Sequence, residues 1–197
     1  MKEDGDRRGP WQVLGSRQVY ENAWIRVRED DVIRPDGQPG IYGVVEFQGL
    51  AVAIVALTED EQVYLVGQYR YPTDTYSWEV VEGTSEAGEE PLTAAKRELS
   101  EETGLTASEW LDLGRCYFSN SSTDQVGYLY VARGLTAGEP HPDETEELAV
   151  KVVPLEEAVA MSLSSEIDDA FSIIGLLRAW NYLHGNTQQA TGNKVGF

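Results

Sequence analysis

The sequence predicts an α+β protein in which a β-rich N-terminal region precedes one main domain. Three observations predict this class: strand-like segments fill residues 11–69, one short acidic helix follows, and a longer apolar helix closes the chain. A chain of 197 residues, 41% of them hydrophobic, can bury a substantial core. No internal repeat or low-complexity linker interrupts it, so we expect one cooperative unit.

The first strands are predicted between the N-terminus and residue 48. Segments 11–20 and 24–34 are rich in Val, Ile, Trp and Tyr, with a polar turn between them. The sequence Arg34-Pro35-Asp36-Gly37 is typical of a turn, because proline presets φ and glycine accepts a positive φ. A further strand is predicted near 41–48, whereas the charged residues 1–10 are expected to be disordered.

The next two strands are predicted near 50–58 and 62–69. Glu59, Asp60 and Glu61 lie between them and are expected at the tip of a hairpin. The segment Leu50 to Leu57 is almost wholly apolar, which predicts a central strand that is buried on both faces.

A helix is predicted over residues 89–102. Pro91 lies in its first turn, where a missing N–H has no cost, and Gly104 follows its last turn. The residues predicted to form its apolar face are Leu92, Ala95 and Leu99.

The remaining elements are three strands and two helices. The strands are expected near 108–118, 125–133 and 147–153, and a short helix is expected after Pro154. The last helix is predicted over about 166–183, with residues at helical spacing that indicate core packing rather than a cofactor site: Ile167, Ala170, Phe171, Ile174 and Leu177. Residues 186–197 are expected to be flexible.

The composition excludes several classes of protein. With 34 acidic and 15 basic residues, the formal net charge is -19, which argues against nucleic acid or an anionic membrane as the main partner. Cys116 is the only cysteine, so no intrachain disulfide is possible. The N-terminus has no apolar segment of a signal peptide and no run approaches 18 apolar residues, so the expected location is the cytoplasm.

Three carboxylates share one face of the predicted acidic helix. Glu98, Glu101 and Glu102 stand at i, i+3 and i+4, a spacing that places them together on a helix of 3.6 residues per turn. Like charges at this spacing repel one another. A hard divalent cation with oxygen ligands would convert this repulsion into binding, so the spacing predicts a metal site.

These carboxylates belong to a longer pattern, in which the spacing of glycines, glutamates and an arginine resembles the signature of the Nudix hydrolases. The matching residues are Gly83, Glu89, Arg97, Glu98, Leu99, Glu101, Glu102, Gly104 and Leu105. The resemblance implies a Nudix-type α/β/α sandwich with a mixed β-sheet over residues 49–185. It also implies that residues 11–48 are an added N-terminal β subdomain.

The resemblance implies a hydrolase that cuts a nucleoside diphosphate linked to another moiety, with Mg²⁺ or Mn²⁺ as cofactor. By the family pattern, the metal ligands are the carbonyl of Gly83 and the carboxylates of Glu98, Glu101 and Glu102, of which Glu102 is also a catalytic group. Arg97 would act in catalysis by pairing with Glu89 and orienting the metal-binding helix. Metal ions can neutralise the charge that develops on a leaving phosphate, which agrees with this chemistry.

Sequences near the signature resemble the ADP-ribose and nucleotide-sugar pyrophosphatase branch. They are Gln68-Tyr69-Arg70-Tyr71-Pro72, Trp78-Glu79 and Glu82-Gly83. Arg70 would contact a phosphate or the terminal sugar, or else is a surface arginine paired with a carboxylate. Glu79 would line the same substrate-binding mouth, and Glu82 either reaches a metal or water or is structural.

One departure from that branch affects the choice of substrate. ADP-ribose enzymes often carry a proline where this chain has Ser119-Asn120-Ser121-Ser122. The absence of the proline weakens the assignment to ADP-ribose in particular and leaves ADP-glucose, GDP-mannose and similar nucleotide sugars open as substrates.

The catalytic base of that branch often lies on a loop before a late strand. The acidic segment Asp143 to Glu147 precedes the predicted strand 147–153 and resembles this loop. We hypothesise that Glu144 activates water and that Glu146 is a second candidate, although an ordinary acidic loop would have the same sequence.

The N-terminal subdomain suggests a partner and a base-binding site. In the branch that the chain resembles, such strands exchange between subunits, so a homodimer is predicted. Trp24, Arg26 and Tyr42 are candidates to contact the nucleotide base, although aromatic residues on strands commonly serve only in packing.

The leading interpretation is therefore metal-dependent hydrolysis of a nucleoside diphosphate sugar to a nucleoside monophosphate and a sugar phosphate. One alternative is a hydrolase of another nucleoside diphosphate derivative, such as a dinucleoside polyphosphate or a dinucleotide coenzyme. The other is a nucleotide-sugar-binding regulator without catalytic activity.

Overall fold

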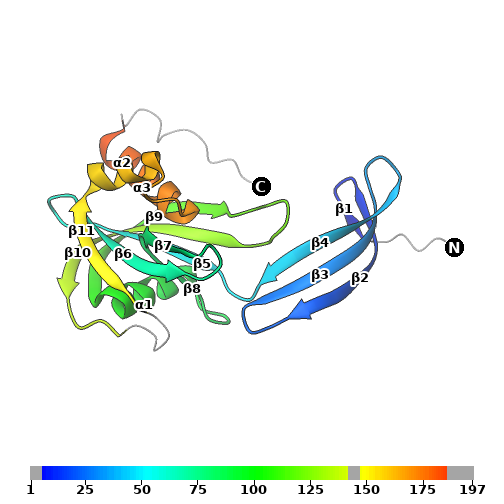
Figure 1. Ribbon diagram of the computed structural model, residues 1–197, viewed down its shortest axis with the longest axis horizontal. Coiled ribbons are helices and arrows are strands. Elements are labelled where there is room, and N and C mark those ends of the chain that lie inside the picture. Colours follow the sequence, from blue (N-terminus) through cyan, green and yellow to red (C-terminus); the bar gives the residue numbers. More distant parts are fainter. Residues whose placement is uncertain (1–5, 142–146, 186–197) are drawn as a thin grey trace.

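A computed structural model describes residues 6–141 and 147–185 of the chain. These residues form three β-sheets and three α-helices, and the four-stranded N-terminal sheet projects from a compact body (Figure 1). None of the helices in the described part is long and apolar enough to cross a membrane.

The N-terminal sheet has the strand order β1-β2-β3-β4 and is antiparallel throughout. Its strands are β1 (Arg7–Arg8), β2 (Trp11–Glu21), β3 (Ile25–Ile33) and β4 (Pro39–Phe47). The expectation of disorder over residues 1–10 is wrong for Arg7 and Arg8. Gly9, with a φ of 60°, reverses the chain there, so that Arg7 pairs with Gln12.

The body contains a mixed sheet of order β8-β5-β10-β9 and an antiparallel sheet of order β11-β6-β7. The strands are β5 (Ala51–Ala56), β6 (Gln62–Arg70), β7 (Thr75–Glu79), β8 (Val81–Thr84), β9 (Leu105–Tyr117), β10 (Val126–Ala137) and β11 (Ala149–Pro154). All of β5 is buried, and it lies between β8 and β10, the latter parallel to it. The predicted central strand is thus confirmed.

The helices cover opposite faces of the mixed sheet. They are α1 (Pro91–Thr103), α2 (Leu155–Ser164) and α3 (Ala170–His184). Because side chains alternate along a strand, Val52 and Ile54 pack with Leu99 of α1, whereas Val55 packs with Leu176 of α3. This two-sided core is the predicted α/β/α sandwich, with α1 on one side and α2 and α3 on the other (Figure 1).

Three details differ from the sequence-based expectations. Strands β7 and β8 were not predicted, because both are short; β7 pairs with the preceding strand β6, and β8 pairs with β5, which is more distant in sequence. The turn at 59–61 does not join one hairpin, since β5 and β6 belong to different sheets and meet only at the bridge Leu57–Val63. Leu177 is 37% exposed, and neither Leu177 nor Ala170 joins the core that contains Ile167, Phe171 and Ile174.

The N-terminal sheet contacts the body through β4 and residues 119–124. Tyr42 donates its hydroxyl hydrogen bond to the carbonyl of Ser121 over 2.7 Å, and the backbone N–H of Phe47 donates to Asp124 Oδ1 over 2.9 Å. Val45 forms a parallel bridge with Thr123. These contacts fix the end of β4, where Phe47 and Asp124 line a cavity at the start of α1.

Candidate active site

Helix α1 presents its carboxylates to a cavity of about 590 Å³ between the helix, β5, β6 and β8. Glu102 is 5% exposed, the side chain of Glu98 is 14% exposed and that of Glu101 is 42% exposed. All three line the cavity, which confirms that the i, i+3, i+4 spacing gathers them on one side. Burial raises the pKa of the Glu98 carboxyl, although Arg97 opposes this effect.

Arg97 connects the start of α1 with the face that carries the three carboxylates. Its Nη2 donates to Glu89 Oε2 over 2.9 Å, and its Nη1 donates to both Glu98 and Glu101 over 2.9 Å. Nη2 also donates to the carbonyl of Thr84 over 3.0 Å. The bond to Glu89, with the carboxylates beside it, raises the pKa of Arg97 and lowers the pKa of Glu89. The predicted pairing of Arg97 with Glu89 is thus confirmed. Arg97 also holds the carboxylate of Glu98 in place.

Gly83 lies directly against the carboxylate of Glu98. A Cβ atom at position 83 would stand 2.0 Å from Glu98 Cδ and 2.2 Å from its Oε1. The backbone N–H of Thr84 donates to the same Oε1 over 3.2 Å. Any larger residue at position 83 would therefore displace the Glu98 carboxylate from its place against β8.

The donor set fits a hard divalent cation. Carboxylate and carbonyl oxygens from Gly83, Glu98, Glu101 and Glu102 are the ligands that Mg²⁺ and Mn²⁺ prefer. Within residues 6–141 and 147–185, no three acidic, histidine or cysteine side chains converge into a finished metal cage. Arg97 contacts one oxygen of Glu98 and one oxygen of Glu101, so a cation can bind the other oxygen of each carboxylate while Arg97 keeps both in place.

Arg70 and Glu82 lie at the mouth of the cavity, and Arg70 pairs with a further carboxylate, that of Glu79. Arg70 Nε donates to Glu79 Oε1 over 2.9 Å, and its Nη2 bonds the other carboxylate oxygen, an arrangement that raises the pKa of Arg70. Burial, with the nearby Asp169, raises the pKa of Glu82 well above its ordinary value. Arg70 and Glu82 line the cavity, and the buried Glu79 holds Arg70 in place.

The predicted base-binding residues fall in different places. Trp24 is 74% exposed and lines the cavity. Arg26 pairs with Glu21 on the N-terminal sheet, and Tyr42 packs edge-on against Trp11 with ring centroids 5.2 Å apart. Within one described chain, Arg26 and Tyr42 do not line the cavity with Trp24.

Several residues that line the cavity were not predicted as part of the site, and three of them come from separate elements. Gln68 comes from β6, Gln125 from the segment before β10, and Phe171 from the first turn of α3. Phe171 packs against Phe118 with ring centroids 5.7 Å apart, and a Cβ at Gly127 would stand 2.1 Å from its ring. Gln68 belongs to the segment that resembles the pyrophosphatase branch, but no local sequence signal marks Gln125 or Phe171, because contacts between distant segments bring them to the cavity.

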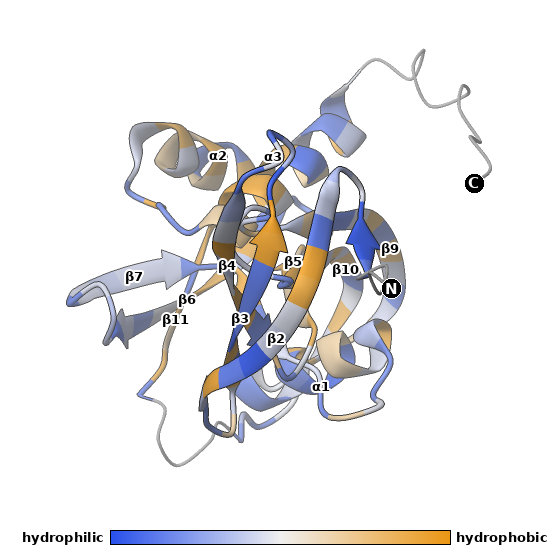
Figure 2. Cartoon of the chain, turned by 90° about the vertical axis from the view of Figure 1, so that its right-hand side faces the viewer, coloured by the Kyte–Doolittle hydropathy of each residue, from blue (hydrophilic) through white to orange (hydrophobic). Residues whose placement is uncertain are grey.

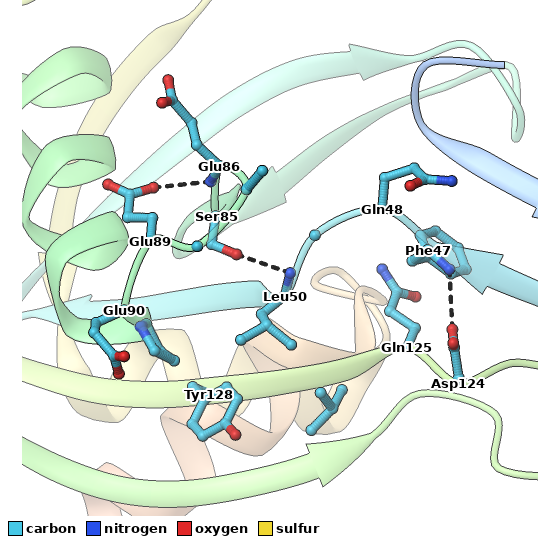
Figure 3. A pocket seen from close by; sticks show the side chains of 15 residues that line it. Phe47, Gln48, Leu50, Ser85, Glu86, Glu89, Glu90, Asp124, Gln125 and Tyr128 are labelled. Carbon is cyan, nitrogen blue, oxygen red and sulfur yellow. Dashed lines mark hydrogen bonds between the residues drawn. The ribbon is translucent and has the colours of Figure 1, made fainter.

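A second cavity of about 390 Å³ lies next to the start of α1 (Figure 3). Figure 3 shows the backbone N–H of Leu50 bonded to Ser85 Oγ over 2.9 Å and that of Glu86 bonded to Glu89 Oε2 over 2.9 Å. The second bond fixes the carboxylate that pairs with Arg97. The segment that contains Glu86 and Glu89 therefore helps to orient α1 through Arg97.

Glu144 and Glu146 lie outside the described residues. His141, the last described residue before them, lies close to α1, since its backbone N–H donates to the carbonyl of Glu101 over 2.8 Å.

Comparisons with known proteins agree with this geometry. The NUDIX domain family matches residues 48–172, and the family described as nucleoside diphosphate sugar hydrolase N-terminal domain matches residues 11–45. The chain therefore belongs to the Nudix hydrolase family, as the resemblance of its signature implied.

Individual relatives extend the comparison over most of the chain. An ADP-ribose pyrophosphatase of Bacillus subtilis is 32% identical, with 81% of this chain and 86% of the relative covered. An ADP-ribose pyrophosphatase of Mycobacterium tuberculosis is 34% identical, with 85% and 82% covered. A protein of Bacillus methanolicus named methanol dehydrogenase activator is 31% identical, with 84% and 90% covered. A solved structure of an ADP compounds hydrolase shares the fold, with a TM-score of 0.79 at 23% identity, and covers 92% of this chain and 99% of its own.

Proposed function

We propose that this protein hydrolyses the pyrophosphate bond of a nucleoside diphosphate sugar, giving a nucleoside monophosphate and a sugar phosphate. The observation that carries the proposal is the single cavity that joins the α1 carboxylates, Gly83 and Arg70. Relatives named for ADP-ribose and ADP-sugar hydrolysis support the same substrate class. ADP-ribose, ADP-glucose and GDP-mannose are the first substrates to test.

In this reaction, an oxygen of water bonds to one phosphorus as the bond from that phosphorus to the bridging oxygen breaks. Mg²⁺, or Mn²⁺ in its place, held by Gly83, Glu98, Glu101 and Glu102, would supply the positive charge that the leaving phosphate requires. Arg97 would orient these carboxylates through its bonds to Glu98 and Glu101. Arg70, oriented by Glu79, would bind a phosphate oxygen at the mouth of the cavity.

A carboxylate must accept the proton of the attacking water, and we assign this role to Glu144, with Glu146 as the second candidate. The contact of His141 with Glu101 supports this assignment, because it brings the chain close to α1 three residues before Glu144. A carboxylate next to a bound cation can act as a base near neutral pH. If Glu144→Gln and Glu146→Gln both retain near-normal turnover, the base lies elsewhere.

We further propose a cytoplasmic homodimer in which residues 11–48 exchange between subunits. Apolar stretches lie along β2 and β3 (Figure 2), and Leu14, Val19 and Trp24 are 57%, 54% and 74% exposed. A partner subunit would cover such side chains. It would also allow Arg26 and Tyr42 to reach a base in the partner's cavity. Light scattering should give a mass of two chains, and a mass of one chain would contradict the exchange.

The proposed activity is tested by coupling product formation to a phosphatase across a panel of nucleotide sugars. Phosphate should be released with Mg²⁺ from at least one nucleotide sugar, and EDTA should abolish the release. The matched variant Glu98→Gln should lose about 100-fold or more in kcat, because it removes one charged ligand. Turnover of only dinucleoside polyphosphates or dinucleotide coenzymes would shift the substrate class.

The name of the Bacillus methanolicus relative favours one second candidate, a nucleotide-sugar-binding regulator of another protein. Tight binding of ADP-ribose by calorimetry, without any metal-dependent product, would support it. The complete set of signature carboxylates favours the enzyme.

A further inference from the structure

Ser172 lies in the first turn of α3 and contacts the active-site wall from the opposite side to α1. Its side chain is fully buried, at 0% exposure. Its Oγ accepts a hydrogen bond from the backbone N–H of Val80 over 3.0 Å and donates to Glu82 Oε1 over 2.8 Å. A serine hydroxyl carries one proton, so the bond from Val80 leaves that proton for Glu82. The hydroxyl is therefore held in one orientation.

Val80 occupies a point in the chain that no strand pairing holds. Strand β7 ends at Glu79 in one sheet and β8 begins at Val81 in the other, so the chain changes sheets at Val80. A buried backbone N–H at such a point needs a partner, and Ser172 provides it. Ser172 is itself fixed, because its own N–H donates to the helix-capping carboxylate of Asp169 over 2.8 Å.

The segment that Ser172 holds contains Gly83, one of the groups of the cation site, and Glu82, which lines the same cavity. Glu82 lines the cavity, and the next residue, Gly83, lies against the Glu98 carboxylate. A shift of the segment 80–83 would therefore move the Glu82 carboxylate and the Gly83 carbonyl relative to Glu98. Groups that contact metal ligands without binding the metal commonly set the orientation of those ligands in this way.

We propose that Ser172 is a positioning residue for the divalent-cation site, acting through Val80 and Glu82 on the segment that carries Gly83. It makes α3 a functional part of the site as well as a cover for the sheet. That the bound cation serves catalysis rests on the proposed function. The Mn²⁺ measurement below needs no substrate, so its result is separate from turnover.

The test is a titration of Mn²⁺ against the full chain, with free Mn²⁺ measured by electron paramagnetic resonance at about 0.15 M salt to suppress weak surface binding. Ser172→Ala and Glu82→Gln should each weaken the tight site about tenfold. The double variant should be no weaker than the weaker single variant, because both changes break one interaction. Ser172→Cys retains most of the side-chain volume but donates weakly, so it should weaken Mn²⁺ binding even if Ser172→Ala folds poorly.

Ser162 provides a matched control. It is also a buried serine of a C-terminal helix, at 7% exposure, but its Oγ donates to the carbonyl of Val159 over 2.8 Å. Ser162→Ala should lower Tm like Ser172→Ala yet bind Mn²⁺ as the wild type does. Unchanged Mn²⁺ affinity in both Ser172→Ala and Ser172→Cys would overturn the inference, as would losses that simply add in the double variant. If the wild type binds Mn²⁺ but cleaves no nucleotide sugar, the proposed function fails while these affinities still decide the role of Ser172.

Discussion

At the scale of single residues, Arg97 determines how α1 presents its carboxylates. One guanidinium contacts Glu89, Glu98, Glu101 and the carbonyl of Thr84, a geometry that needs several donors in one plane. A lysine at this position keeps the charge but presents a single point of contact.

We therefore expect Arg97→Lys to reduce kcat/KM by about 10- to 100-fold, because the carboxylates lose their common orientation. Steady-state kinetics at saturating Mg²⁺ measures the loss. Arg133→Lys is the control, since Arg133 makes a single contact of 3.7 Å with the exposed Glu59. Equal activity of the Arg97→Lys and Arg133→Lys variants would contradict this role.

Gly83 gives a second prediction at the residue scale. Gly83→Ala should weaken Mn²⁺ binding by about 10- to 100-fold, because the added methyl group occupies the position of the Glu98 carboxylate. The affinity is measured by calorimetric titration. Gly15→Ala is the control, because a Cβ at Gly15 meets nothing within 4 Å. Wild-type affinity in Gly83→Ala would show that Glu98 can bind the cation from another position.

At the scale of elements, the N-terminal sheet contains an ion pair that affects stability. Asp30 is 3% exposed, and Arg28 Nε donates to its Oδ1 over 3.0 Å. Burial alone would raise the pKa of Asp30, but hydrogen bonds from Ser16 and Arg28 outweigh burial and lower it. A carboxyl whose folded pKa is depressed stabilises the fold above its unfolded pKa, and this stabilisation disappears as the pH falls through the folded pKa.

Asp30→Asn should therefore lower the free energy of unfolding at pH 7 by about 1.5–3 kcal/mol, the range for a hydrogen bond to a charged group. The difference from wild type should shrink as the pH falls below about 3.9, the unfolded value for aspartate. Urea denaturation at several pH values measures it, with the exposed neighbour Asp31 as the Asp31→Asn control. A difference that stays constant down to pH 2.5 would contradict the role of the charge.

The elements also show which features could be predicted from the sequence. Helix α1 was predicted because its signals are local: Pro91 in the first turn, Gly104 with a φ of 71° at the end, and carboxylates at helical spacing. Strand β7 was missed because it is short, and β8 was missed because its partner β5 comes from a distant segment. Ser172 was missed for the same reason, since its partner Val80 lies 92 residues away.

At the scale of the whole molecule, the net charge of -19 opposes the approach of an anionic substrate. Among the described residues that line the cavity, only Arg70 and Arg97 are basic. Salt screens this repulsion over distances longer than about 10 Å and leaves short contacts in the cavity largely intact.

We therefore expect kcat/KM to rise about two- to fivefold between about 20 and 150 mM NaCl, through a faster encounter. Initial rates at limiting nucleotide sugar measure it, and repetition at two saturating Mg²⁺ concentrations controls for competition between Na⁺ and Mg²⁺. A steady fall of kcat/KM with salt would show that local arginines dominate the approach of substrate.

We propose that the cavity at α1 performs metal-dependent cleavage of a nucleotide-sugar pyrophosphate. ³¹P NMR tests it most directly, with the protein and ADP-ribose, ADP-glucose or GDP-mannose in parallel samples. With Mg²⁺, the two diphosphate resonances of at least one substrate should be replaced by those of a nucleoside monophosphate and a sugar phosphate. In EDTA the diphosphate resonances should persist. Intact diphosphate in every sample, or equal cleavage in EDTA, would contradict the claim.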